Sequence, residues 1–188
     1  MNSPVPFDEL NILGYTIDKH FDENGKIKSR QDCEDIIDEM LDLYLLACAR
    51  GVEQTNADLD GDYRPGMSEV EDIVDRKIAG KTWRDRVYEY FDNGGTKADI
   101  MRIAETETHR DANESAYVTA RANGAKTKTW HCMMLDTSRD SHRWLNGVSS
   151  PIDGYFYSIN GGVTQFPGEW GIAEEDVGCL CWLTYGKQ

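Results

Sequence analysis

The chain has 188 residues, 39% of them hydrophobic, which suffices for one sizeable core or two small ones. Its formal net charge of -14 is concentrated at one end: residues 1–75 hold 19 acidic and 6 basic side chains, whereas residues 76–188 hold 15 and 14. The acidic part would repel a nucleic-acid backbone, which argues against phosphate binding there and suits either solubility or docking on a basic protein surface.

The sequence carries no signal of export or membrane insertion. It has no apolar run of about 18 residues, and MNSPVPFDELNILGY lacks the basic and apolar regions of a signal peptide. The five cysteines are an odd number, which argues against a disulfide framework. We therefore expect reduced thiols, no membrane contact and a cytoplasmic location after synthesis.

The first 66 residues are predicted to form one segment. Residues 1–28 are expected to be an irregular arm with a turn at Asn24-Gly25. A long amphipathic helix of about 25 residues follows within 29–59, because apolar side chains recur there at spacings of three and four. The turn formers of DGDYRPG at 60–66 are expected to end it.

Residues 67–188 are predicted to form a second segment, which starts with two short helices. Ser68 and Glu71 match a capping box that would begin a helix reaching AGKT at 79–82. Thr82 can cap the next helix, over WRDRVYEYF at 83–91.

The longest helical pattern of this segment starts at Thr96 and Asp99, a second capping box, and ends at Asn123-Gly124. Three- and four-residue spacings place a set of apolar and acidic side chains on one face: Ile100, Ile103, Ala104, Glu107, Asp111 and Glu114. A carboxylate on such a stripe needs a partner, so Glu107 is a candidate member of a buried polar site.

After Gly124 the chain becomes rich in Thr, aromatic residues, Gly and Pro. Strands are predicted in KTKTWHCMML (126–135), GYFYSI (154–159) and CLCWLTY (179–185), with a short helix around SRDSHRWLNG (138–147). The predicted fold class is therefore α+β, with long amphipathic N-terminal helices followed by a small, turn-rich C-terminal β region that has one short helix.

His142, Cys179 and Cys181 form a candidate metal site, to which Asp136 or Asp140 could contribute a fourth ligand. One imidazole and two thiolates suit a structural zinc ion. The spacing argues against it, because structural zinc sites commonly use Cys-x-x-Cys and because a strand would point the two sulfurs to opposite faces. We expect no cofactor, with structural zinc as the alternative.

Two further chemistries are weighed against simpler interpretations. A nucleophilic pair could combine a cysteine with a histidine, but nothing in the sequence positions the base beside the thiol; the candidates are Cys132, Cys179 or Cys181 with His142 or His131. The acidic series between the first two helices has the spacing of a calcium loop: Asp58, Asp60, Asp62 and Glu69, with Arg64 between them. Tyr63 replaces the required glycine and Pro65 stiffens the loop, so a solvated turn is favoured.

A structural polar cluster is the preferred interpretation of the charged residues around Arg139 and of Glu107 on the long helix. An arginine with several carboxylate partners can fasten the C-terminal region to the long helix. The predicted members are Glu107, Asn113, Asp136, Arg139, Asp140 and His142.

An ordered series from about residue 75 to 183 resembles the phage head morphogenesis, or minor head protein, family related to protein F of phage Mu. The matching positions are Arg102, Thr106-Glu107, Asn113, Trp130, Asp136, Arg139, His142, Gly147, Pro151-Ile152-Asp153, Phe156, Pro167-Gly168 and Cys179-Leu180-Cys181. Thr137 and Leu180 stand where the family pattern has arginines, and Gly178 stands where it has asparagine. The loss of these arginines argues against an anion-binding or catalytic site here, and it agrees with a cluster that maintains the fold.

The resemblance implies a virion component that acts in head morphogenesis, in the capsid interior or portal region, and is present in the host cytoplasm during assembly. Its implied partners are the portal protein and capsid proteins, with contact to packaged DNA as a further option. We expect no enzymatic activity. The alternative is a metal-dependent hydrolase or nuclease that uses Glu107, Asp136 and His142.

Overall fold

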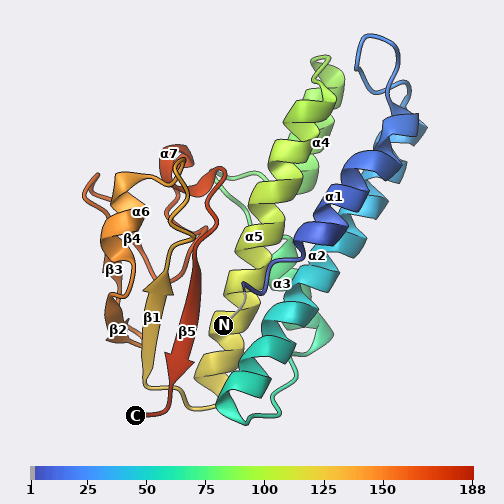
Figure 1. The fold of residues 1–188 in the computed structure, drawn as a ribbon. Helices are drawn as coiled ribbons and strands as arrows, with labels where there is room; N and C mark the ends of the chain where they lie inside the picture. Colours follow the sequence, from blue (N-terminus) through green and yellow to red (C-terminus); the bar gives the residue numbers. More distant parts are fainter. Residues whose placement is uncertain (1–2) are drawn as a thin grey trace.

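The computed structural model describes residues 3–188, in which a layer of helices packs against a small region of strands and turns (Figure 1). Two long helices dominate the first layer, α2 (Arg30–Leu59) and α5 (Lys97–Ala122). They run side by side in the same direction, as the hydrogen bond from Asn123 Nδ2 to Asn56 Oδ1, 2.7 Å long, illustrates at their C-terminal ends. The predicted α+β class is confirmed.

The predicted acidic helix is α2, and it is longer than expected. The Ser29 hydroxyl caps its start by accepting from the Asp32 amide, and Asp60 ends it in the left-handed conformation (φ 48°). Gly51 lets α2 approach α5 closely, because a Cβ there would lie 2.3 Å from the Ala112 carbonyl oxygen. The apolar stripe is buried as the spacing predicts at seven positions: Cys33, Ile36, Ile37, Met40, Tyr44, Ala47 and Cys48. Leu41, predicted with them, is only partly buried, and Leu43 is buried in addition.

The prediction of an irregular arm over residues 1–28 is wrong for its middle. That part forms α1 (Phe7–Thr16) and a 3₁₀ turn, η1 (Ile17–His20), and α1 packs on α2. Leu10, Leu13 and Ile17 are buried in the core. A helix this short is marginal on its own, so burial against α2 decides its conformation. The turn predicted at Asn24-Gly25 is present between the bridged residues Phe21 and Ile27.

The two short helices differ in how well local sequence predicts them. The predicted cap at Ser68 is wrong: α3 (Met67–Val74) begins after Gly66 without a side-chain cap and ends before AGKT. By contrast, α4 (Trp83–Asp92) begins with the expected cap at Thr82, which forms a capping box with Asp85. The second predicted box, Thr96 with Asp99, likewise begins α5.

The C-terminal region contains two small antiparallel sheets. In the larger, β1 (Thr127–His131) lies between β2 (Ser149–Pro151) and β5 (Trp182–Gly186); in the smaller, β3 (Phe156–Tyr157) pairs with β4 (Val163–Thr164). The predicted short helix is α6 (Asp140–Leu145), and α7 (Ala173–Asp176) is an additional one. The last strand starts at Trp182, so the strand predicted from residue 179 begins too early.

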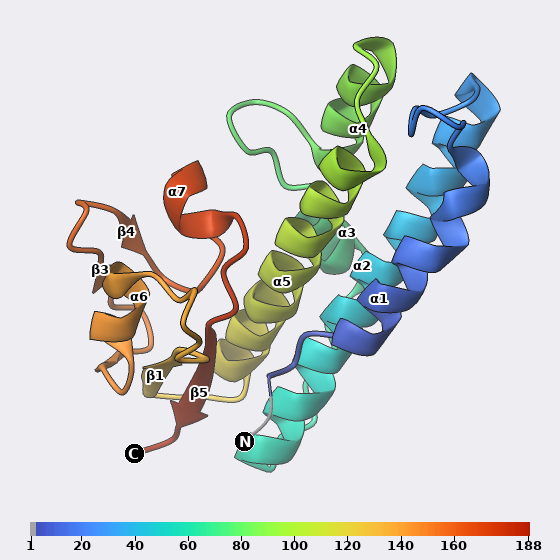
Figure 2. The ribbon, with the colours of Figure 1, turned by 45° about the horizontal axis from the view of Figure 1, so that its top comes forward.

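The helix α5 is buried from both sides. The rotated view shows α2 and α1 on one side of it and the strands β1 and β5 on the other (Figure 2). One hydrophobic core joins α1, α2, α3, α4 and the first part of α5, and a second gathers aromatic and sulfur side chains of the C-terminal region with Tyr117 of α5. The boundary predicted at residue 66 falls between α2 and α3, but it does not separate two cores, because α2 and α5 contribute to the same one.

Across residues 3–188, none of the helices combines the length and the apolar character that crossing a bilayer requires.

Replacing Trp83 by alanine should destabilise the protein by about 3–5 kcal/mol. Trp83 is fully buried and meets the Tyr44 ring edge to face at a centroid distance of 4.8 Å. Urea unfolding measures the change. Trp144→Ala is the matched control, because 72% of Trp144 is exposed, and its effect should stay within about 0.5 kcal/mol. Equal effects of the two variants would contradict this core.

Candidate functional site

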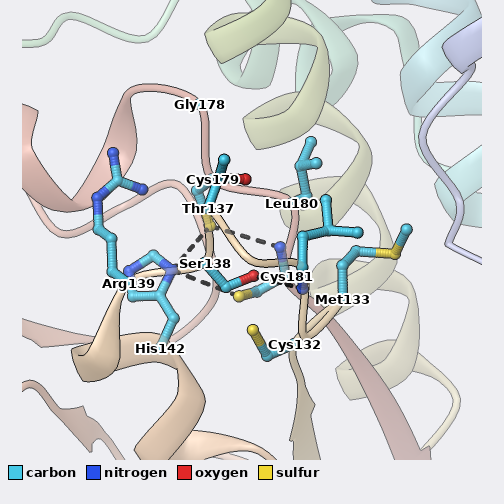
Figure 3. Close-up of a pocket in the computed structure, with 11 residues that line it drawn as sticks. Cys132, Met133, Thr137, Ser138, Arg139, His142, Gly178, Cys179, Leu180 and Cys181 are labelled. Carbon is cyan, nitrogen blue, oxygen red and sulfur yellow. Dashed lines mark hydrogen bonds between the residues drawn. The ribbon is translucent and has the colours of Figure 1, made fainter.

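Three potential metal ligands meet between α6 and the segment before β5 (Figure 3). His142 Nδ1 lies 3.5 Å from Cys179 Sγ and 3.4 Å from Cys181 Sγ. All three residues are buried, with 3%, 3% and 2% of their surfaces exposed. The structure therefore brings together the three candidate metal ligands that the sequence suggests, although the sequence analysis expects no cofactor.

A turn before β5 puts both sulfurs on the same side. The Cys179 amide donates to the Asp176 carbonyl, and Gly178 between them has φ 68°, which favours glycine. The Cys181 amide then donates to Cys179 Sγ at 3.5 Å. The prediction that the sulfurs point to opposite faces is wrong, because the cysteines precede the strand.

Glu175 of α7 holds the histidine from the other side. Its Oε2 lies 3.0 Å from His142 Nε2, as an ion pair, and accepts from Ser141 Oγ at 2.8 Å. Its Oε1 accepts from Ser158 Oγ at 2.5 Å and from Asn160 Nδ2 at 2.9 Å. Sequence reasoning missed Glu175, because only the tertiary fold brings this exposed-looking acidic run next to His142.

These contacts shift the pKa values of Glu175 and His142, and those of the two cysteines. Burial opposes ionisation of Glu175, but hydrogen bonds from Ser158, Asn160 and Ser141 outweigh it and hold its pKa below the usual range. Burial likewise opposes the imidazolium of His142, yet the Cys179 and Glu175 contacts raise its pKa.

The two cysteines are driven apart in pKa because they share a site. For Cys179, burial raises the pKa, and the hydrogen bond from Cys181 together with the nearby histidines outweighs burial and lowers it. For Cys181, the hydrogen bond to Cys179 and then burial raise the pKa. One thiolate is therefore favoured, on Cys179, facing the imidazole.

The same segment is attached to α5 through its backbone. The Cys181 carbonyl accepts from His109 Nε2 at 2.6 Å and from Asn113 Nδ2 at 3.2 Å. Both side chains are buried on α5, and Asn113 was among the predicted cluster residues. We call these contacts, with the His142 contacts to the cysteines and Glu175, the C-terminal clasp.

The predicted polar cluster does not form one network. Glu107 is fully buried and pairs with Arg86 and Arg110. Arg139 donates instead to the Val177 carbonyl. Asp136 and Asp140 are exposed on the surface. The sequence pattern could not separate these contacts, because residues close along the chain face different neighbours in space.

The buried charges on α5 form a second group, which we call the α5 charge network. Arg110, 1% exposed, contacts Glu107 and Asp111, and Arg76 from the end of α3 pairs with Glu114 and Glu169. Burial raises the pKa of Asp111 well above its usual range despite the adjacent Arg110. Of these residues, the sequence singled out Glu107, Asp111 and Glu114 but not their arginine partners.

Of the two histidines considered for a nucleophilic pair, only His142 lies beside a cysteine sulfur. His142 lies beside Cys179 and Cys181, whereas His131 contacts Thr184 Oγ1 at 2.8 Å and stacks on Trp182. A cysteine thiol, the His142 imidazole and the Glu175 carboxylate follow one another as the three groups of a nucleophilic triad do. Both sulfurs are buried, however, so a substrate would not reach them.

In the acidic turn after α2, Glu69 accepts from the Tyr63 hydroxyl rather than facing the aspartates. Asp60 is the residue that ends α2, and Asn56 Nδ2 donates to the Tyr63 carbonyl at 2.8 Å. The turn thus has internal hydrogen bonds, as a helix-ending loop does, which agrees with the non-calcium interpretation.

Comparison with known proteins finds a phage relative. Over 91 residues the chain is 34% identical to the minor head protein GP7 of Bacillus phage SPP1. The match covers 47% of this chain and 30% of that protein, so it spans less than a third of the relative's length. No family model matches the chain, and neither does any solved structure. The chain is therefore similar, over about half its length, to a phage minor head protein.

Glu114 should make the protein less stable as pH rises from about 4.5 to about 7. Burial raises the pKa of Glu114 from 4.5 to about 7. Attraction to Arg76 and Arg110 lowers this pKa, and repulsion from Glu169 and Glu107 adds to the increase. In that window the folded carboxyl keeps a proton that the unfolded chain releases, so unfolding is favoured with rising pH, by on the order of 3 kcal/mol in total.

Urea unfolding of wild type and Glu114→Gln across this window tests the point. The free-energy difference between the two proteins should change with pH in favour of the variant. Glu71→Gln, at an exposed site on α3, should follow the wild-type slope. Parallel slopes for wild type and Glu114→Gln would contradict the raised pKa.

Proposed function

We propose that the protein is a phage minor head protein that acts in head morphogenesis, associates with the portal and capsid proteins, and has no enzymatic activity. The similarity to the minor head protein of phage SPP1 carries the proposal. That similarity supports the broader of the sequence predictions, and kinship with protein F of phage Mu stays a prediction.

The geometry of the matched motif residues supports a structural role for them. Asn113, His142, Cys179 and Cys181 lie far apart in sequence and meet in the C-terminal clasp. Trp130 packs edge on against His142 at a centroid distance of 6.0 Å. Residues that hold a domain closed explain the ordered series without requiring a reaction.

The hydrolase alternative receives less support from the same contacts. Glu107 is occupied by two arginines, His142 faces Glu175 and the cysteines, and Asp136 is exposed. The three residues therefore do not converge as a catalytic set would. We infer a protein that works by binding other head proteins.

The exposed face of α2 is the surface that we propose docks on the portal. Asp38, Asp42 and Glu53 are exposed and lie on one stripe of that helix, by its 3.6-residue repeat. A row of carboxylates complements a basic protein surface and speeds encounter with it. The same charge disfavours direct contact with packaged DNA.

Co-purification with the portal protein of the same phage tests this proposal. Wild type should be retained by tagged portal, and Asp38→Lys/Asp42→Lys/Glu53→Lys should be retained at least tenfold less, about 1.4 kcal/mol or more. The control Glu71→Lys/Asp72→Lys/Asp136→Lys changes the charge equally at other exposed positions and should bind as wild type does. Deleting residues 1–66 is unsuitable, because α2 contributes to the core.

Two results would contradict the proposal. Absence of the protein from purified virions and procapsids would exclude a head component. Metal-dependent cleavage of DNA by the purified protein, lost in His142→Ala, would contradict the non-enzymatic part. Equal portal binding by both charge variants would exclude only the α2 surface.

A further inference from the structure

We propose that His142, Cys179 and Cys181 bind a zinc ion, whose fourth ligand is a water molecule in the cavity beside them. The inference rests on this geometry and is independent of the head-protein proposal.

The spacing of the three donor atoms fits a tetrahedral ion. With zinc–sulfur bonds of about 2.3 Å and zinc–nitrogen bonds of about 2.0 Å, a tetrahedral site separates sulfur from nitrogen by about 3.5 Å. The observed separations from His142 Nδ1 are 3.5 Å to Cys179 Sγ and 3.4 Å to Cys181 Sγ. The side chains need little or no movement to coordinate.

The surroundings of His142 prepare it as a ligand. The Glu175 carboxylate lies 3.0 Å from Nε2 and favours the neutral tautomer whose proton is on Nε2, which leaves the lone pair of Nδ1 on the side of the sulfurs. Glu175 is itself held by Ser141, Ser158 and Asn160. A carboxylate behind a coordinating histidine is a recurring outer shell of zinc sites, and here it is buried and fully hydrogen-bonded.

The sulfurs are also placed as thiolate ligands are. The Cys181 amide donates to Cys179 Sγ, the kind of backbone contact that the Cys-x-x-Cys spacing usually supplies. Two thiolates would balance the charge of a divalent ion among the buried rings of Trp130 and Trp170. A mixed imidazole and thiolate set favours zinc over calcium or magnesium, which prefer oxygen ligands.

The fourth position opens on a cavity of about 30 Å³, lined by the three ligands and by Cys132, Ser138 and Arg139 (Figure 3). This volume holds a single water molecule. Cys132 is a neighbour rather than a member of the three-residue cluster, and its sulfur accepts from the Met134 amide at 3.5 Å. We therefore assign the fourth position to water and not to a fourth protein ligand.

Metal analysis of the full chain tests the assignment. The protein is reduced, stripped with a chelator, incubated with zinc chloride and desalted; elemental analysis should then find one zinc per chain. Cys179→Ser and Cys181→Ser should lose the metal, while Cys132→Ser, at the edge of the same cavity, and Cys33→Ser on α2 should keep it. Glu175→Gln should weaken zinc binding by about 10- to 100-fold.

A second readout does not depend on the variants' folding. Cobalt added to the stripped wild type should give the intense absorption of tetrahedral cobalt with thiolate ligands, and zinc should raise its melting temperature. Wild type that binds no zinc, or cobalt without thiolate absorption, would overturn the proposal. Loss of zinc in Cys132→Ser would overturn the assignment of three protein ligands.

Discussion

The fold depends on satisfying the polar side chains of α5, a helix buried from two sides. A helix in this position would ordinarily carry apolar residues all round, yet α5 buries Glu107, His109, Arg110, Asp111 and Asn113 in succession. Each finds a partner: arginines and carboxylates meet in the α5 charge network, and His109 and Asn113 donate to the backbone of the C-terminal segment. Because an unpaired charge or donor in this setting costs several kcal/mol, the positions of α3, α4 and residues 179–181 are fixed together.

This constraint explains the shape of the C-terminal region. Its strands are short, and two of them have only two residues, so its ladders alone would hold it weakly. The C-terminal clasp supplies further contacts that hold this region to the helices. It ties α5 to the Cys181 carbonyl on one side, and on the other it ties α6 and α7 to the two sulfurs through His142 and Glu175. Aromatic side chains then fill the space between these contacts, with Trp130 at the centre.

The sequence correctly predicted the features that depend on interactions between residues close along the chain. The helix caps at Thr82 and Thr96 and the spacing of α2 need no distant partner, and the structure has them. The helix α1 was missed because its burial against α2, and not its own propensity, stabilises it. His142, Cys179 and Cys181 could be named from their residue types, but not their convergence, because the turn at Gly178 and the position of Glu175 follow from tertiary contacts. The predicted network joining Arg139 to Glu107 failed for the same reason.

Hydrogen exchange of wild type and Asn113→Ala tests most directly whether the clasp holds the C-terminal region to α5. Asn113 Nδ2 reaches the Cys181 carbonyl, one residue before β5 begins. The account predicts faster exchange of the β1 and β5 amides in the variant, while the amides in the middle of α2 keep their wild-type protection. Unchanged protection of β1 and β5, or equal loss of protection throughout the chain, would contradict it.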